Sequence, residues 1–184
     1  MTREEVRELV SFASGLHVRV VPAFQTLGHY ENFLLDPDNF PLAEFPGAQC
    51  LSPAEEKVYP FLKQALGAVC EAFSDSLVNA GCDETWDTGR GKSRAQARRE
   101  GLAAVHAAHY RRVHSLVTAY GRRMLMYGDI ILNNPRILES GALPRDVVIV
   151  DWHYNAAASY PSVARFRASG LQVLVSPGLP VSAA

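Results

Sequence analysis

The residues best suited to chemistry are two adjacent acids, Asp83 and Glu84, in the run GCDETWD at 81–87. Adjacent acids are commonly surface charge, so the pair alone indicates little. Neighbouring residues on a regular strand also face opposite ways, so both carboxyl groups can reach one place only if the strand breaks before them. Gly81 suits such a break, because glycine tolerates backbone conformations that other residues avoid. We therefore expect the chain to turn at Gly81.

Acidic, aromatic and amide side chains recur near the ends of the other apolar, strand-like runs. The candidates are His29, Trp86, Tyr127, Asp129, Trp152 and Asn155. Taken singly, Asp129 suits a helix N-cap, Trp152 suits core packing and His29 suits a turn. Together they favour a single site, because a (β/α) barrel builds its active site at the carboxyl ends of successive strands. Carboxylates and aromatic rings without a metal set or a phosphate loop are typical of carbohydrate cleavage.

Strand-like and helix-like segments alternate along the chain that must position these residues. Apolar runs predict five strands, at 17–21, 76–79, 123–127, 146–152 and 171–175. Helices are predicted to begin at two capping boxes, Thr2–Glu5 and Ser52–Glu55, and to occupy 95–120, 135–140 and 160–169. Several strands are continuously apolar, which is typical of a parallel sheet covered by helices.

Alternating units of this kind build either an open doubly wound sheet or a barrel. No GxGxxG follows the first strand and no GxxxxGK[ST] occurs, so nucleotide binding has no support. The 184 residues suffice for one domain with a substantial core. We predict an α/β fold, a partial TIM (β/α)8 barrel of about five βα units, as a single domain over residues 1–184.

Composition is that of an ordinary globular protein and excludes several partners. The formal net charge of -1 does not favour nucleic acid. No apolar run approaches the roughly 18 residues of a membrane span. Three cysteines, without zinc-type spacing, predict neither a disulfide framework nor a metal site. The charged start at Thr2–Glu8 does not read as a signal peptide, which favours the cytoplasm. The oligomeric state is left open.

The stretch at 79–84 resembles the signature [His/Asn]-x-Gly-x-Asp-Glu of glycoside hydrolase family 20, the β-N-acetylhexosaminidases. The stretch at 21–29 is similar to the preceding family strand, which ends in Gly-His. The segments at 126–129 and 150–152 resemble the next two strands. The Gln-Thr before Gly-His and the segment at 87–93 look closest to the subgroup that includes hexosaminidase D and its bacterial relatives.

This resemblance implies hydrolysis of terminal non-reducing β-linked N-acetylglucosamine or N-acetylgalactosamine, from a glycan or glycoside, without a cofactor. The substrate's own 2-acetamido group would act as the nucleophile, with retention of configuration. Glu84 would protonate the leaving oxygen and then activate water. Asp83 would hold the acetamido N–H and stabilise the oxazolinium ion.

The resemblance also implies the residues that contact the substrate. Trp152 would cover the acetamido methyl group, and Tyr127 and Asp129 would contact the acetamido group or the sugar hydroxyls. His29 would support the acid, and Trp86 and Asn155 are further candidates.

The chain also departs from the family pattern. A closed barrel of this class has eight strands, and the five predicted here correspond to strands three to seven of the family barrel. The arginine that usually grips the outer sugar hydroxyls and the final strand, with its Trp and acidic residue, have no counterpart. We therefore expect an incomplete catalytic barrel. The alternative left open is a non-catalytic fragment that binds sugar weakly or needs a partner chain.

Overall fold

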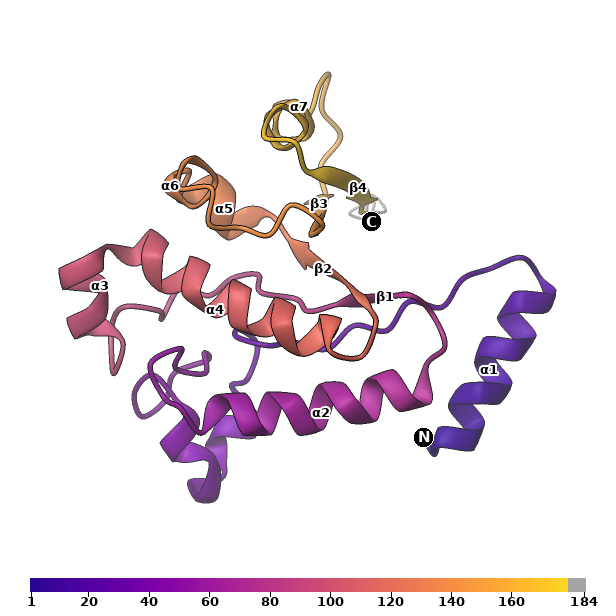
Figure 1. Ribbon diagram of the computed structural model, residues 1–184, viewed down its shortest axis with the longest axis horizontal. Helices are drawn as coiled ribbons and strands as arrows, with labels where there is room; N and C mark the ends of the chain where they lie inside the picture. The colour runs from indigo at the N-terminus through magenta and orange to yellow at the C-terminus, as the bar shows by residue number, and fades with distance from the viewer. Residues whose placement is uncertain (179–184) are drawn as a thin grey trace, which may run out of the picture.

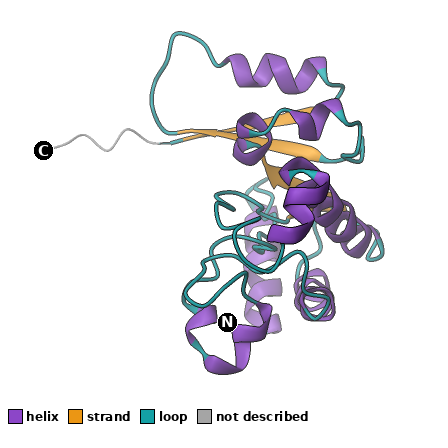
Figure 2. Cartoon of the chain, turned by 90° about the vertical axis from the view of Figure 1, so that its left-hand side faces the viewer, coloured by secondary structure: helices purple, strands orange, loops and turns teal. Residues whose placement is uncertain are grey.

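A computed structural model describes residues 1–178, in which four parallel strands form one sheet in the order β1-β2-β3-β4 (Figures 1 and 2). The strands are β1 (Leu77–Asn79), β2 (Arg123–Tyr127), β3 (Val148–His153) and β4 (Gln172–Pro177). The helices are α1 (Arg3–Gly15), η1 (Phe33–Leu35), η2 (Pro37–Leu42), α2 (Val58–Ala72), α3 (Arg94–Glu100), α4 (Leu102–Thr118), α5 (Asp129–Asn133), α6 (Arg136–Glu139) and α7 (Pro161–Ala168). Helices connect successive parallel strands, so the predicted α/β class is confirmed.

Strand β2 shows how both faces of the sheet are buried. Met124 and Met126 belong to the main core, which the helices α2 and α4 cover along one side (Figure 1). Leu125 lies on the opposite face, in a smaller cluster with Val148 and Val150. Successive side chains of a strand alternate between its faces, and here each face meets apolar neighbours. The strand is therefore continuously apolar, and each large side chain contributes about 1.5–3 kcal/mol on burial.

The strand predicted at 17–21 is wrong. The chain joins β1 only at an isolated parallel bridge between Ala23 and Asn79. The N–H of Asn79 donates to the Pro22 carbonyl at 2.9 Å, and the N–H of Phe24 donates to the Asn79 carbonyl at 2.8 Å. β1 is only three residues long, and His17 turns the chain with a φ of +59° just after α1. The contact with the sheet is therefore displaced toward the loop that follows Pro22.

The two predicted capping boxes have different outcomes. Thr2 and Glu5 form the predicted reciprocal pair of hydrogen bonds at the start of α1. The box at Ser52 is wrong, because α2 begins at Val58 and the Ser52 hydroxyl has no hydrogen-bond partner in the described chain. The carboxylate of Glu55 lies 3.1 Å from the ammonium of Lys92 instead. In a capping box the Glu55 carboxylate would accept the backbone N–H of Ser52, and here it pairs with Lys92 instead.

The single long helix predicted at 95–120 is two helices, α3 and α4. They separate at Gly101, which has φ +88° and ψ 149°. This backbone region is almost restricted to glycine, because a side chain there collides with its own backbone. The helical periodicity continues across Gly101, so the sequence pattern does not reveal the break.

Replacing Gly101 by alanine is expected to lower the free energy of unfolding by about 1–3 kcal/mol through backbone strain alone. No atom outside the immediate backbone lies within 4 Å of the added Cβ, so packing contributes little. Urea denaturation measures the change. Gly15→Ala is the matched control, since its Cβ also enters open space but φ there lies outside the strained region. Equal effects of the two substitutions would contradict the strain argument.

The remaining elements lie close to their predicted positions. Strand 123–127 is confirmed, and the strands predicted at 146–152 and 171–175 start one or two residues later, as β3 and β4. The helix predicted at 160–169 is α7, and the one at 135–140 contains α6. The short helix α5 was not predicted.

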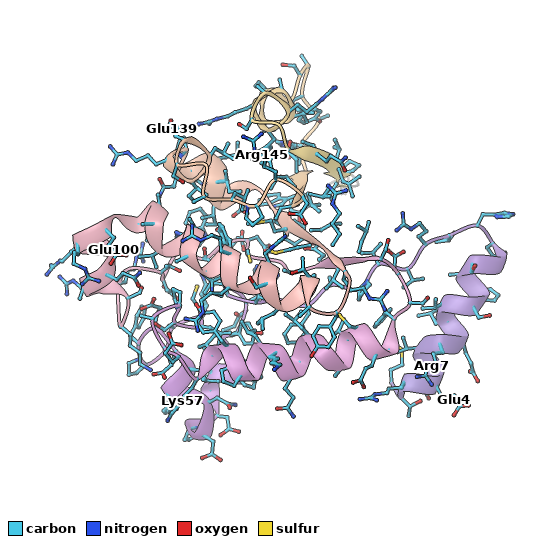
Figure 3. The ribbon with its side chains drawn as sticks, viewed as in Figure 1. Glu4, Arg7, Lys57, Glu100, Glu139 and Arg145 are labelled. Atoms are coloured by element: carbon cyan, nitrogen blue, oxygen red, sulfur yellow. The ribbon has the colours of Figure 1, made fainter. Side chains whose placement is uncertain are left out.

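The surface is polar at the periphery, where labelled side chains such as Lys57, Glu100 and Glu139 project away from the core (Figure 3). None of the helices in residues 1–178 is both long and apolar enough to cross a membrane.

Candidate functional site

The backbone turns sharply where β1 ends, and this turn positions the two acids. The Asn79 side-chain oxygen accepts the N–H of Gly81 at 3.0 Å. Gly81, Cys82 and Glu84 then have φ values of +67°, +71° and +50°. Positive φ is uncommon for residues other than glycine and often marks functional sites, where surrounding contacts hold the strain. The strand has therefore broken before the acid pair, at the residue expected from the sequence.

Both acidic side chains converge on one imidazole ring. The His29 Nε2 lies 3.1 Å from Asp83 Oδ2 and 3.6 Å from Glu84 Oε2. These three residues, His29, Asp83 and Glu84, are called the acid cluster below. His29 has a φ of +60°, in the loop that follows the bridge to β1. Two loops distant in sequence thus bring the candidate residues together at the carboxyl end of β1.

Asp83 is held more firmly than Glu84. Its Oδ1 accepts a hydrogen bond of 2.8 Å from Gln25 Nε2, and only 16% of its side chain is exposed. The side-chain oxygen of Gln25 also accepts the N–H of Cys82 at 3.3 Å. Gln25 therefore fixes the backbone of the turn and one of its carboxylates together. The sequence motif contains Gln25, but no role was predicted for it.

Glu84 combines a fixed backbone with an exposed side chain. Its N–H donates to Asp129 Oδ2 at 2.9 Å, and its carbonyl accepts from Gln49 Nε2 at 3.2 Å. The side chain is 45% exposed and makes no hydrogen bond within the described residues beyond its approach to His29. A carboxyl group in this setting can reach a bound molecule and exchange protons with it.

Asp129 lies beside the acid cluster at the start of α5. Its second oxygen, Oδ1, is buried and has no hydrogen-bond partner in the part of the chain described. Burial raises the pKa of Asp129, an effect that the Glu84 N–H opposes and the charge of Asp83 reinforces. Asp129 is not the N-cap of α5, a position that Gly128 occupies. Its carboxylate supports the backbone of Glu84 through Oδ2, while Oδ1 stays buried.

Two of the predicted aromatic residues, Tyr127 and Trp152, lie at the carboxyl ends of β2 and β3. Tyr127 ends β2, and its pKa is raised by burial and further by the charge of Asp83. Trp152 lies on β3, with its indole N–H buried and without a partner among residues 1–178. The ring of Tyr154 lies 4.9 Å from that of Trp152. Tyr154 extends this aromatic surface and was not among the predicted residues.

Two predicted residues lie apart from the acid cluster. Trp86 lines a separate pocket between α3 and α5. Asn155 is exposed near Trp152, and its carbonyl accepts a hydrogen bond of 3.1 Å from the Tyr160 hydroxyl. Neither side chain hydrogen-bonds to an acid of the cluster.

Two of the three histidines of α4, His106 and His109, are buried in the packing, whereas His114 lies 2.9 Å from the Asp146 carboxylate. His106 Nε2 lies 3.0 Å from Thr85 Oγ1, and its Nδ1 lies 3.1 Å from the Leu102 carbonyl. Burial lowers the pKa of His106 to about 4 and that of His109 to about 3, so both rings are neutral at pH 7. Residues 1–178 contain no group of three side chains suited to hold a metal ion. His106 therefore supports the loop after Glu84 from behind.

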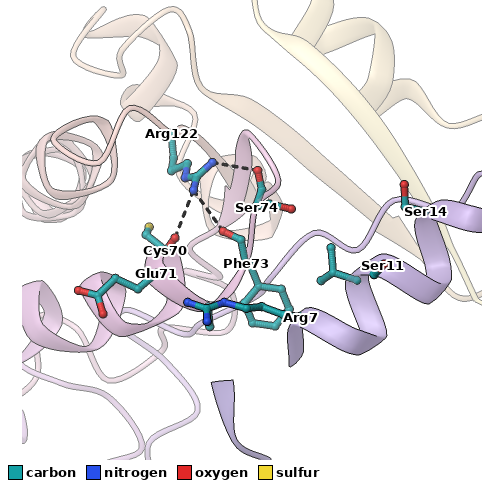
Figure 4. Close-up of a pocket in the computed structure, with 10 residues that line it drawn as sticks. Arg7, Ser11, Ser14, Cys70, Glu71, Phe73, Ser74 and Arg122 are labelled. Carbon is teal, nitrogen blue, oxygen red and sulfur yellow. Dashed lines mark hydrogen bonds between the residues drawn. The ribbon is translucent and has the colours of Figure 1, made fainter. Parts of the chain in front are cut away.

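A pocket of about 570 Å³ between α1 and α2 lies at the opposite edge of the sheet. Arg122 lines it and donates to the carbonyls of Cys70, Phe73 and Ser74 at 3.2, 3.2 and 3.0 Å (Figure 4). These carbonyls belong to the end of α2 and the residues after it, where a cation is favourable. Arg122 precedes β2, so this pocket lies at the amino ends of the strands, the edge that barrels use for stability.

A parallel sheet with acids and aromatic rings gathered at the carboxyl ends of its strands defines part of a (β/α) barrel. The chain belongs to glycosyl hydrolase family 20, whose catalytic-domain model matches residues 1–181. No curated protein sequence matches the chain. The predicted family is thus confirmed, whereas the hexosaminidase D-like subgroup stays a prediction.

Solved structures share the fold at low sequence identity. An exo β-N-acetylglucosaminidase from Vibrio harveyi superposes with a TM-score of 0.74 at 19% identity, over 96% of this chain and 28% of that one. A chitobiase from Flavobacterium johnsoniae superposes with a TM-score of 0.77 at 17% identity, over 97% of this chain and 28% of that one. A β-N-acetylhexosaminidase from Bacteroides fragilis superposes with a TM-score of 0.73 at 21% identity, over 95% of this chain and 35% of that one. The chain therefore spans about a third of the length of these structures.

Proposed function

We propose that this chain carries the catalytic acids of an exo-hydrolase that removes terminal β-linked N-acetylglucosamine or N-acetylgalactosamine. The observation that carries the proposal is the asymmetric acid cluster. Asp83 is fixed by Gln25 and His29, whereas the side chain of Glu84 is 45% exposed. One fixed and one accessible carboxylate match the two tasks of a substrate-assisted mechanism. The family and the fold of the neighbouring structures support the same reaction class.

In the first step, the acetamido oxygen of the substrate attacks C1 while the glycosidic C–O bond breaks. Glu84 donates its proton to the leaving oxygen, and Asp83 accepts the acetamido N–H and orients the group. An oriented nucleophile within the substrate supplies a large effective molarity. In the second step, Glu84 takes a proton from water as that water attacks C1. The bond between C1 and the acetamido oxygen breaks in the same step, which reopens the oxazolinium ring, and the configuration at C1 is retained.

Two buried polar atoms, one on Asp129 beside the acid cluster and one on Trp152 of β3, fit a polar substrate. The Asp129 Oδ1 is an acceptor and the Trp152 indole N–H is a donor, and both lack partners in the described chain. Each unpaired buried group costs about 1–3 kcal/mol, which a substrate hydrogen bond offsets. Trp152 is proposed to cover the acetamido methyl group, and Tyr127 to contact the acetamido group or a sugar hydroxyl.

The experiment compares an aryl N-acetyl-β-glucosaminide with the matched aryl β-glucoside, which lacks the acetamido group. Release of the aryl alcohol from the first substrate alone is expected, together with tight binding of a thiazoline mimic of the oxazolinium ion. The aryl N-acetyl-β-galactosaminide tests the galacto preference. If folded chain neither hydrolyses these substrates nor binds the thiazoline, the proposal fails for this chain. A fragment that binds sugar weakly or needs a partner chain is then favoured.

A further inference from the structure

The segment at 87–93, which joins the turn after β1 to α3, has no role in the proposed reaction. In the structure it meets the loop at 43–51, which an antiparallel bridge between Ala43 and Leu51 closes. The segment at 87–93 is called the motif loop below, and that at 43–51 the bridged loop. The two loops form hydrogen bonds with each other at two places, and one of these places lies next to Glu84.

The first of these places holds the end of the motif loop. The buried Glu44 accepts the N–H of Ser93 on Oε2 at 3.1 Å and the hydroxyl of Ser93 on Oε1. The Glu44 carbonyl accepts the N–H of Lys92 at 2.9 Å. A Cβ at Gly91 would overlap this carbonyl oxygen, so the approach of the two loops requires a glycine there. The motif loop is therefore fixed against the bridged loop before α3 begins.

The second place is formed by Gln49. Its N–H donates to Asp87 Oδ2 at 2.8 Å, and its carbonyl accepts the N–H of Tyr30 at 2.9 Å. Because the backbone of Gln49 is held on both sides, its side chain has a fixed origin. From there Nε2 donates to the Glu84 carbonyl at 3.2 Å. Asp87 thus holds the residue that holds Glu84.

Glu84 needs this support because its backbone is strained. Its φ of +50° is a conformation that side chains with a Cβ disfavour. The N–H of Glu84 is held by Asp129, and its carbonyl by Gln49. These two backbone groups flank the Cα atom, so fixing both of them fixes the direction of the Cα–Cβ bond. The position of the carboxyl group near His29 depends on that direction.

A hydrogen bond from a side-chain amide to a backbone carbonyl is common in loops. Asn39 makes one as well, from Nδ2 to the Phe33 carbonyl at 3.1 Å, far from the acids in sequence. Gln49 differs in the residue that it holds. The Glu84 carbonyl also accepts the N–H of Trp86 at 2.9 Å, so two donors converge on one oxygen. A carbonyl has two lone pairs, and both are then engaged.

We propose that Gln49, itself held by Asp87, is a positioning residue that orients the carboxyl group of Glu84 toward the leaving oxygen. The inference rests on the proposed function, because it takes Glu84 as the acid. Gln49 acts through the backbone of Glu84 and not on the substrate. It keeps the strained turn from relaxing, and Asp87 gives the motif loop its part in the reaction.

The first test compares two leaving groups. Gln49→Met removes the donor and keeps a neutral side chain of similar length. It is expected to lower kcat/KM about tenfold for an N-acetyl-β-hexosaminide with a sugar leaving group. For a dinitrophenyl leaving group, which departs without protonation, the loss should stay below about twofold. Asn39→Leu, the matched control, should alter neither value. Equal losses with both leaving groups would overturn the proposal, because they would show a general structural effect.

The second test asks whether Gln49 acts through its two partners. Asp87→Leu removes the acceptor and should resemble Gln49→Met, whereas Asp87→Asn keeps an acceptor oxygen and should stay within about twofold of the unmodified chain. In a Glu84→Gln background, Gln49→Met should cause no further loss, because no acidic proton remains to be oriented. Additive losses from Gln49→Met and Glu84→Gln would contradict the proposal. Equal losses in the two Asp87 variants would contradict the part given to Asp87.

Amide hydrogen exchange measures the positioning without catalysis. In Gln49→Met the N–H groups of Glu84 and Trp86 should exchange about tenfold faster, because the backbone between them is no longer held. The N–H of Ala97, in α3, should keep its rate, and Asn39→Leu should change none of the three. A common increase at all three N–H groups, or no increase at any, would overturn the proposal. If no substrate is hydrolysed, the proposed function fails, and the exchange rates decide the positioning by themselves.

Discussion

Replacing Glu84 by glutamine is expected to lower kcat/KM about 10³-fold for an N-acetyl-β-hexosaminide with a sugar leaving group, within the range of general acid catalysis. Glutamine has the same shape but no acidic proton. The backbone of the residue keeps its hydrogen bonds to Asp129 and Gln49, so the turn persists. Steady-state kinetics measure the loss, and circular dichroism verifies the fold.

The leaving group separates a proton donor from a merely structural residue. A dinitrophenyl group departs without protonation, so Glu84→Gln should change kcat/KM for that substrate by less than about tenfold. With this substrate, the kcat and KM of the Glu84→Gln variant should fall together, because the attack of water in the second step still lacks Glu84 as its base. Glu8→Gln, on α1, is the control and should alter neither parameter. A uniform loss with both leaving groups would show that Glu84 is not the acid.

Much of the acid cluster could be predicted, because it follows from local rules. A glycine before two acids at a strand end indicates a turn, and the carboxyl ends of parallel strands meet at one edge. Those rules placed Asp83 and Glu84 together with Tyr127, Asp129 and Trp152 near one end of the sheet.

The contacts that hold the cluster could not be predicted in this way. Gln25 and Asp83 are 58 residues apart in the chain. Their hydrogen bond depends on the loop after Ala23 lying against the turn after β1, a tertiary arrangement that no periodicity encodes. The same limit applies to Gln49, whose amide reaches the Glu84 carbonyl.

Trp86 shows that proximity in sequence and proximity in space can differ. Glu84 has a positive φ, and the N–H of Trp86 donates back to the Glu84 carbonyl at 2.9 Å. This tight turn directs the chain away from the acid cluster within two residues. The indole consequently lines the neighbouring pocket. Sequence adjacency is a weak guide wherever backbone dihedral angles change sign.

Replacing Gly81 by alanine is expected to damage both the fold and the site. Its φ of +67° costs an ordinary residue about 1–2 kcal/mol. The added Cβ would also overlap the side-chain oxygen of Gln25, the residue that holds Asp83. We therefore expect a loss of about 2–4 kcal/mol in the free energy of unfolding, the strain and the overlap together. Hydrolysis should fall by about 10²-fold, because a misplacement of about 1 Å has that effect.

Three further variants separate backbone strain from the clash with Gln25: Gly141→Ala, Gln25→Ala, and Gln25→Ala combined with Gly81→Ala. Gly141→Ala is the matched control, because its φ is +62° and nothing lies within 4 Å of the added Cβ. It should lose about 1–2 kcal/mol and keep full activity. In a Gln25→Ala background, Gly81→Ala should cost no more than this control, because the overlapping side chain is gone. Denaturant titration of the four proteins in this double-mutant cycle gives the coupling energy, expected at about 1–2 kcal/mol. A coupling energy of zero would mean that the two substitutions affect the free energy of unfolding independently, which contradicts the predicted overlap between the added Cβ and Gln25.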